Sequence, residues 1–169
     1  DLTQVDTVLD RIIRDLHNDF AHHAEPKDIV RIGWIWDSVP KQLAKDNNKF
    51  VFSHVKEGTR ARDLEDALQW LVDAGLVYRL EMVSALQIPL SSCSDATFFK
   101  TYGADLGLLR RNAGVGYRTV LTEPEGYASF KGAFTENYCM TELTTLGIRP
   151  YYWRSGNSAE VDFLLEDSL

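Results

Sequence analysis

The chain has 169 residues and a mass of 19.2 kDa, enough for one ordinary domain or two small ones. Eighteen basic residues against 25 acidic ones give a net charge of −7, which argues against a protein that coats nucleic acid through bulk charge. No apolar run reaches the ~20 residues of a membrane span, and two cysteines are too few for a disulfide framework, so we expect a cytoplasmic protein without membrane partners.

An amphipathic helix is predicted over residues 1–20, inside a linker segment that covers 1–27. Its apolar residues recur at alternating spacings of three and four, namely Leu2, Val5, Leu9, Ile12 and Leu16. Thr3 and Asp6 resemble a capping box at its start. A stripe of this kind packs on a neighbour, either in this chain or in a preceding domain. Because the chain opens at Asp1 without methionine and stops at Leu169 after a strand-like run, we expect an excerpt of a longer protein.

Residues 28–85 show the order of a winged helix, three helices followed by a strand. The first helix covers 28–36, and Ser38 with Pro40 predicts the start of a short second helix that ends at Lys45. The third helix has a clear apolar period with Gly75 after its end, formed by Leu64, Ala67, Leu68, Leu71 and Val72. The strand covers 76–83.

Residues 86–169 have a different character. A strand is predicted at 97–102, and Asp105 is placed to cap a short helix behind it. Residues 111–126 read as a loop. A longer helix covers 129–146, with Gly147 and Pro150 as stop signals, and 151–154 with 160–166 indicates a hairpin.

A basic strip surrounds the start of the third predicted helix and consists of Lys56, Arg60 and Arg62. In a winged helix this end of the helix can enter the DNA major groove while its cations neutralise phosphates. Acidic residues follow at once, which suits the helix dipole and gives the region a purely structural interpretation. DNA contact and interdomain packing both stay open for this unit.

Two carboxylates are candidates for chemistry. Glu136 falls on the apolar stripe of the helix at 129–146, and a buried carboxylate needs a cation, a donor or a metal as its partner. Asp162 lies in the last strand, on the face opposite its apolar row. Two such oxygen ligands could hold Mg²⁺ for phosphoryl chemistry. The alternative is a glutamate at the edge of the stripe and a solvated strand aspartate.

Other cofactor sites are not indicated. The spacing of His17, His22 and His23 does not suit zinc. The sequence has neither a phosphate-binding loop nor a dinucleotide fingerprint, so we expect no nucleotide cofactor in this part of the protein.

Residues 130–138, 151–155 and 159–164 resemble conserved blocks of the domain of unknown function 4143, and further blocks extend the resemblance over nearly the whole chain. That domain is the C-terminal part of bacterial and archaeal AAA-type ATPases. The resemblance implies a preceding ATPase domain that holds ATP and Mg²⁺, a winged helix, and a region similar to PD-(D/E)XK nucleases. Glu136 then matches the helix glutamate and Asp162 the strand aspartate. The E-x-K element that completes such a site would follow Leu169, so the site in this chain is incomplete.

We therefore expect an α+β fold, with a winged-helix module at 28–85 followed by an incomplete restriction-endonuclease-like α/β domain at 86–169. The expected function is that of a non-catalytic accessory region that packs on its own ATPase domain. A metal-dependent nuclease completed outside this chain and a DNA-binding module are the alternatives. DNA and a second copy of the chain stay open as further partners.

Overall fold

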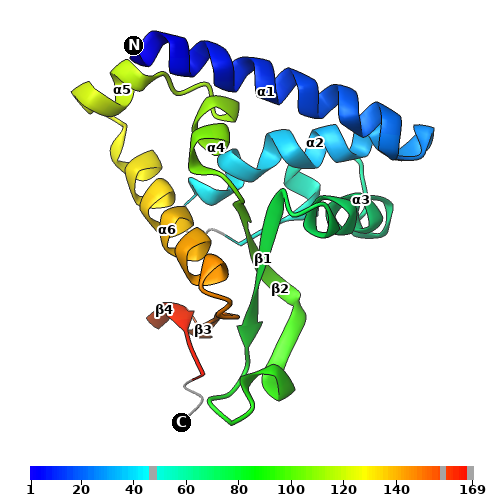
Figure 1. The fold of residues 1–169 in the computed structure, drawn as a ribbon. Coiled ribbons are helices and arrows are strands. Elements are labelled where there is room, and N and C mark those ends of the chain that lie inside the picture. The colour runs from blue at the N-terminus through cyan, green and yellow to red at the C-terminus, as the bar shows by residue number, and fades with distance from the viewer. Residues whose placement is uncertain (46–48, 157–158, 167–169) are drawn as a thin grey trace.

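The chain folds into a four-stranded mixed sheet and several helices, which come both before and after the first two strands in the sequence (Figure 1). This is the α+β fold that the sequence predicts. The computed structural model describes residues 1–45, 49–156 and 159–166. In these ranges the helices are α1 (Leu2–His23), α2 (Pro26–Leu43), α3 (Ala61–Asp73), α4 (Leu106–Asn112), α5 (Tyr117–Thr122) and α6 (Ala128–Thr145). The strands are β1 (Val77–Val83), β2 (Ser94–Gly103), β3 (Tyr151–Ser155) and β4 (Ala159–Leu164).

The strand order of the sheet is β2-β1-β3-β4. β1 and β2 form an antiparallel hairpin in which Leu80 lies opposite Lys100, and β3 joins β1 in parallel. β4 pairs antiparallel with β3, which confirms the predicted C-terminal hairpin. The sheet therefore contains strands from both sides of the expected boundary at residue 85, a position in the connection between β1 and β2. The division of the chain into three segments stays a prediction.

The helices α2 and α3 followed by the β1–β2 hairpin form a winged-helix-like arrangement, and α3 ends as its sequence predicts. Gly75 has a φ of +69°, a conformation that glycine adopts without steric cost. The backbone N–H of Leu76 then donates to the carbonyl of Leu71 over 3.0 Å, the closing bond of a Schellman motif.

The predicted second helix is wrong, because α2 continues through Pro40 to Leu43. Ser38 does not cap a new helix; its hydroxyl donates to the carbonyl of Ile35 inside the same one. Pro40 has no N–H for the carbonyl of Trp36 one turn earlier, which normally breaks a helix. The side-chain amide of Asn112 on α4 donates to that carbonyl over 2.9 Å instead, so the buried oxygen is satisfied and the helix persists.

Two smaller predictions are also corrected. Residues 111–126 are not all loop, since they contain the short helix α5. The N-cap of α1 is Asp1, whose carboxylate accepts the N–H of Thr3, and Thr3 caps nothing. Asp6 is therefore not part of a capping box and is available for contacts with another helix.

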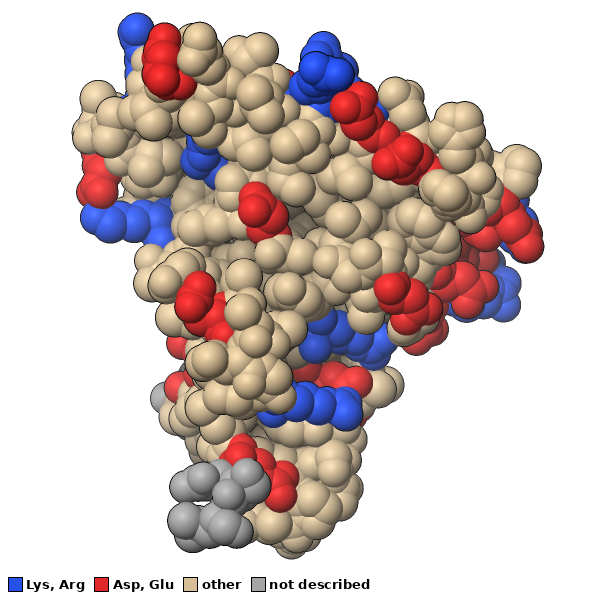
Figure 2. All heavy atoms as spheres, in the orientation of Figure 1, with Lys and Arg blue, Asp and Glu red and all other residues tan. Residues whose placement is uncertain are grey.

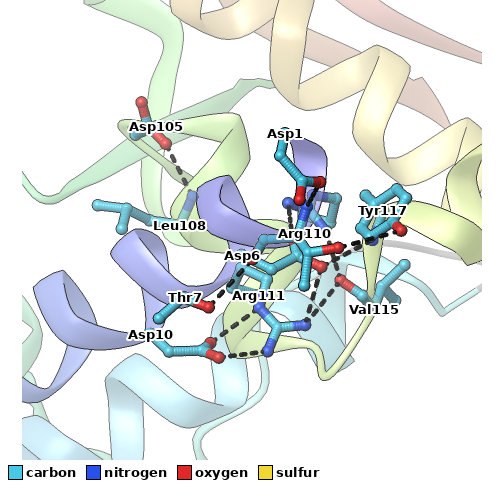
Figure 3. A network of polar contacts seen from close by, with 11 residues as sticks. Asp1, Asp6, Thr7, Asp10, Asp105, Leu108, Arg110, Arg111, Val115 and Tyr117 are labelled. Atoms are coloured by element: carbon cyan, nitrogen blue, oxygen red, sulfur yellow. Dashed lines mark hydrogen bonds and ion pairs between the residues drawn. The ribbon is translucent and has the colours of Figure 1, made fainter.

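An ion-pair network attaches α1 to α4 and α5 (Figure 3). Asp6 accepts from the guanidinium of Arg110 over 2.5 Å and from the backbone N–H of Tyr117 over 3.0 Å. The bond from Arg110 is the main reason that the pKa of Asp6 lies below its ordinary value. Arg111 donates twice to Asp10, over 2.8 and 2.6 Å. These bonds hold the N-terminal half of α1 against the following helices.

The hydrophobic core is continuous from α1 to the C-terminal hairpin. Phe20 of α1, Leu71 of α3, Tyr102 of β2 and Tyr152 of β3 are all buried members of one cluster. Within the described ranges, no helix combines the length and apolar character needed to cross a membrane.

Candidate functional site

The two carboxylates that the sequence singled out meet around one buried lysine. The Nζ atom of Lys100 donates to Oε1 of Glu136 over 3.0 Å and to Oδ1 of Asp162 over 3.0 Å. Glu160 adds a third carboxylate at 2.7 Å from the same nitrogen. We call Lys100, Glu136, Glu160 and Asp162 the lysine–carboxylate cluster. It combines side chains of β2, α6 and β4, elements that are widely separated in sequence.

The position of Glu136 depends on how α6 is attached to the sheet. Its neighbour Asn137 is fully buried, and the side-chain amide bonds the backbone of Gly103 twice. Oδ1 accepts the Gly103 N–H over 2.8 Å, and Nδ2 donates to the Gly103 carbonyl over 2.9 Å. These two bonds fix α6 on the end of β2. Lys100 is three residues before Gly103 in β2. Fixing α6 at Gly103 therefore brings Glu136 close to Lys100.

One side of the cluster is buried, and the other side is exposed to solvent. The side chain of Lys100 is 1% exposed and that of Glu136 13%, whereas Asp162 is 58% exposed. Burial lowers the pKa of Lys100, but the charge of Glu136 and the hydrogen bonds that the ammonium donates to all three carboxylates outweigh it and hold the pKa above its ordinary value. Lys100 is therefore a charged ammonium at neutral pH, in a place where an unpaired charge would be very unfavourable.

Two tyrosines enclose the buried end of the cluster. The hydroxyl of Tyr102 donates to Oε1 of Glu136 over 2.5 Å, and burial together with the Glu136 charge raises its pKa well above the ordinary value. The ring of Tyr152 lies with its centroid 5.3 Å from Nζ of Lys100, a cation–π contact. Burial raises the pKa of Tyr152 to about 12. Both tyrosines are thus protonated and uncharged at neutral pH.

A cavity of about 720 Å³ lies beside the open side of the cluster. Glu136 and Asp162 line it together with Lys45, which follows the end of α2, and Lys131 from the first turns of α6. Its walls are otherwise largely small or apolar, and include Leu43, Ala44, Ala128, Gly132, Ala133 and Phe163. The exposed edge of the cluster is consequently accessible from solvent through this cavity.

The Mg²⁺ that the sequence resemblance implies does not fit the donor set as it stands. Mg²⁺ requires oxygens 2.0–2.1 Å from a common centre. Here the three carboxylate oxygens converge at 2.7–3.0 Å on an atom that is already a cation, Nζ of Lys100. Over residues 1–45, 49–156 and 159–166, no group of three or more His, Cys, Asp or Glu side chains is arranged to hold a metal ion. Glu136 and Asp162 are brought together, but around an ammonium.

The basic strip is at the exposed start of α3, where the sequence places it. Arg62 lies 3.9 Å from the carboxylate of Asp63, and the backbone N–H of Arg60 donates to the same side chain over 3.4 Å. Lys56 lies over the ring of Trp34, 5.5 Å from its centroid. On the molecular face drawn in Figure 2, Lys and Arg are interspersed with Asp and Glu and form no broad basic surface.

Three members of this site were missed by sequence reasoning: Lys100, Tyr102 and Glu160. One signal could have found Lys100, since a lysine in the apolar strand 98–102 must bury its charge and needs carboxylate partners. Glu160 shares a strand with Asp162 at a spacing of two, which places both side chains on one face. Local sequence pattern does not predict that Lys100 and Glu160 meet across the sheet.

Two family models match the chain. The one described as Domain of unknown function (DUF8612) matches residues 2–119, and the one described as Domain of unknown function (DUF4143) matches residues 131–168. The second match confirms the predicted resemblance for the segment that carries Glu136, Glu160 and Asp162. Neither a curated protein nor a solved structure matches the chain.

Proposed function

The chain belongs to the family of the Domain of unknown function (DUF8612), and we propose that it is a non-catalytic interaction module of a larger AAA-type ATPase. It docks on the ATPase domain through helix α1. The observation that carries the proposal is an exposed apolar strip on α1. We define the α1 strip as Val5, Val8 and Ile12, whose exposed fractions are 47%, 55% and 39%.

The α1 strip lies beside the face by which α1 packs on its own chain. Residues 5, 8 and 12 follow helical spacing along one side of α1. The face toward α2 and α4 contains Phe20, which is buried, and the carboxylate of Asp6, which binds Arg110. Adjacent exposed apolar side chains on a helix otherwise rich in charge are typical of a protein-interaction surface. Helix α1 also lies at the outer edge of the fold (Figure 1), where a neighbouring domain can reach it.

The second argument concerns the partner. The DUF4143 match at residues 131–168 supports an AAA-type ATPase as the setting, because the resemblance predicted from the sequence places that domain behind an ATPase domain. Lys100 supports the non-catalytic part of the proposal, since it neutralises the carboxylates that would otherwise bind a catalytic metal. A packing role then accounts for the large apolar side chains of α1 that are exposed within the described residues, Leu2 and the α1 strip.

Hydrogen exchange tests this function. We expect the amides of residues 5–12 to exchange more slowly in the full-length parent protein than in the 169-residue chain, and Val8→Glu to remove the difference. Asn18→Glu is the matched control, because it adds the same charge to an exposed position of α1 outside the strip. Equal exchange of α1 in the parent and in the isolated chain would refute the docking role.

A metal-dependent nuclease is a second candidate, which requires a metal ion to replace the Lys100 ammonium between Glu136 and Asp162. Its test is cleavage of DNA by the parent protein in Mg²⁺ or Mn²⁺. Glu136→Ala and Asp162→Ala should each abolish cleavage. Unchanged cleavage in both variants would assign the activity to another site.

A further inference from the structure

In the lysine–carboxylate cluster the carboxylates surround the ammonium of a side chain, whereas in a metal site they surround a bound metal ion. We propose that Lys100 is the permanent cation of this cluster: its ammonium occupies the place of a divalent ion, so the native chain does not bind a divalent metal there. This inference concerns the cluster alone and does not depend on the docking role of α1.

The first argument is geometric. The three oxygens that face Nζ lie at 2.7, 3.0 and 3.0 Å, which are ordinary lengths for charge-assisted hydrogen bonds from an ammonium. An ammonium has three N–H donors, and here each has its own carboxylate. Ca²⁺ binds oxygens at 2.3–2.6 Å, so the same carboxylates need to move by only a few tenths of an ångström to enclose a metal once the ammonium is gone.

The second argument is the burial of Lys100. Its side chain is 1% exposed, and it extends from β2 across the sheet toward β4. A swing of Nζ into solvent would leave Glu136, which is 13% exposed, without this cation and would break a cation–π contact with Tyr152. A metal that displaces the ammonium would therefore have to break these buried contacts.

The third argument is charge. Three carboxylates face Lys100, and Arg154 lies 3.8 Å from the second oxygen of Glu160. With both cations in place, the local charge is close to −1. Removing the ammonium increases it to about −2 around a partly exposed Asp162 that lines an open cavity, which is the setting in which a divalent cation binds.

Mn²⁺ binding to the whole 169-residue chain tests the proposal, measured by the loss of the free-ion signal in electron paramagnetic resonance. We compare wild type, Lys100→Met, the double variant Lys100→Met/Glu136→Gln, and Lys131→Met, which removes a charge from the same cavity without touching the cluster. The Lys100→Met chain should bind Mn²⁺ at least about tenfold more tightly than wild type, and the double variant should lose this gain. Lys131→Met should behave like wild type.

Two results would overturn the proposal. One is wild-type binding as tight as that of Lys100→Met and sensitive to Glu136→Gln, because the ammonium then does not exclude the metal. The other is a folded Lys100→Met chain that binds no better than Lys131→Met, because the carboxylates then do not form a cation site. If Lys100→Met does not fold, Mn²⁺ broadening of wild-type amide signals decides: selective broadening at residues 136, 160 and 162 contradicts the proposal, and its absence supports it.

Discussion

Lys100 and Asp162 belong to strands at opposite edges of the sheet and are 62 residues apart, yet Nζ of Lys100 donates to Oδ1 of Asp162 over 3.0 Å. This bond joins the hairpin that follows α3 to the C-terminal hairpin. The lysine–carboxylate cluster therefore links distant segments of the chain.

The hydroxyl of Tyr102 should contribute measurably to stability. Tyr102→Phe removes the donor to Glu136, and hydrogen bonds to charged groups contribute about 1.5–3 kcal/mol, so the free energy of unfolding should fall by that amount. Urea denaturation measures it. Tyr138→Phe is the control, since Tyr138 lies on the same helix as Glu136 and is 53% exposed, and it should change stability by less than about 0.5 kcal/mol. Equal effects of the two substitutions would contradict the role of the hydroxyl.

The Asp6–Arg110 contact should hold α1 on the fold. Asp6→Asn removes the anion that Arg110 and the Tyr117 N–H bind, and we expect the free energy of unfolding to fall by about 1.5–3 kcal/mol. Asp15→Asn, on the same helix, removes only an exposed pair with Arg11 and should cost less than about 0.5 kcal/mol. Chemical denaturation compares them. A loss in Asp15→Asn as large as that in Asp6→Asn would point to a general effect of helix charge.

The same contact predicts a specific dependence on pH. Arg110 lowers the pKa of Asp6 in the folded chain below the ordinary 3.8, so folding favours the ionised form. The stabilisation is complete above pH 3.8 and is lost as the pH falls through the lowered folded value. The difference in unfolding free energy between wild type and Asp6→Asn should therefore be constant from about pH 7 to about pH 5 and shrink below pH 3.8. A difference that persists unchanged at pH 2.5 would contradict this origin.

DNA binding by the start of α3 has a direct test. If Lys56, Arg60 and Arg62 contact phosphates, the slope of log K against log salt should fall by about 0.9 for each one changed to Gln. Fluorescence anisotropy with a short duplex measures this slope. A matched triple variant at Arg11, Arg118 and Lys131 removes the same charge elsewhere on the surface. No binding by wild type at low salt would exclude the DNA-binding module.

Sequence pattern correctly predicted those elements whose stabilising interactions join residues close together in the sequence. The apolar period of α3, the positive φ of Gly75 and the cap that Asp105 provides by accepting the N–H of Leu108 all act within a few residues. These elements were predicted correctly because helix hydrogen bonds and caps join neighbours along the chain. The apolar stripe of α6 likewise identified Glu136 as a carboxylate that needs a partner.

Sequence pattern alone predicts the α+β class, most of the helices and strands, and two of the four residues of the cluster. The continuation of α2 through Pro40 depends on a long-range contact, because the amide that satisfies the Trp36 carbonyl comes from Asn112, 76 residues later. The binding of Glu136 and Asp162 to Lys100 likewise depends on the tertiary structure, because strand order and the attachment of α6 by Asn137 bring these side chains together. Such contacts depend on packing between distant segments, which no spacing along the chain encodes.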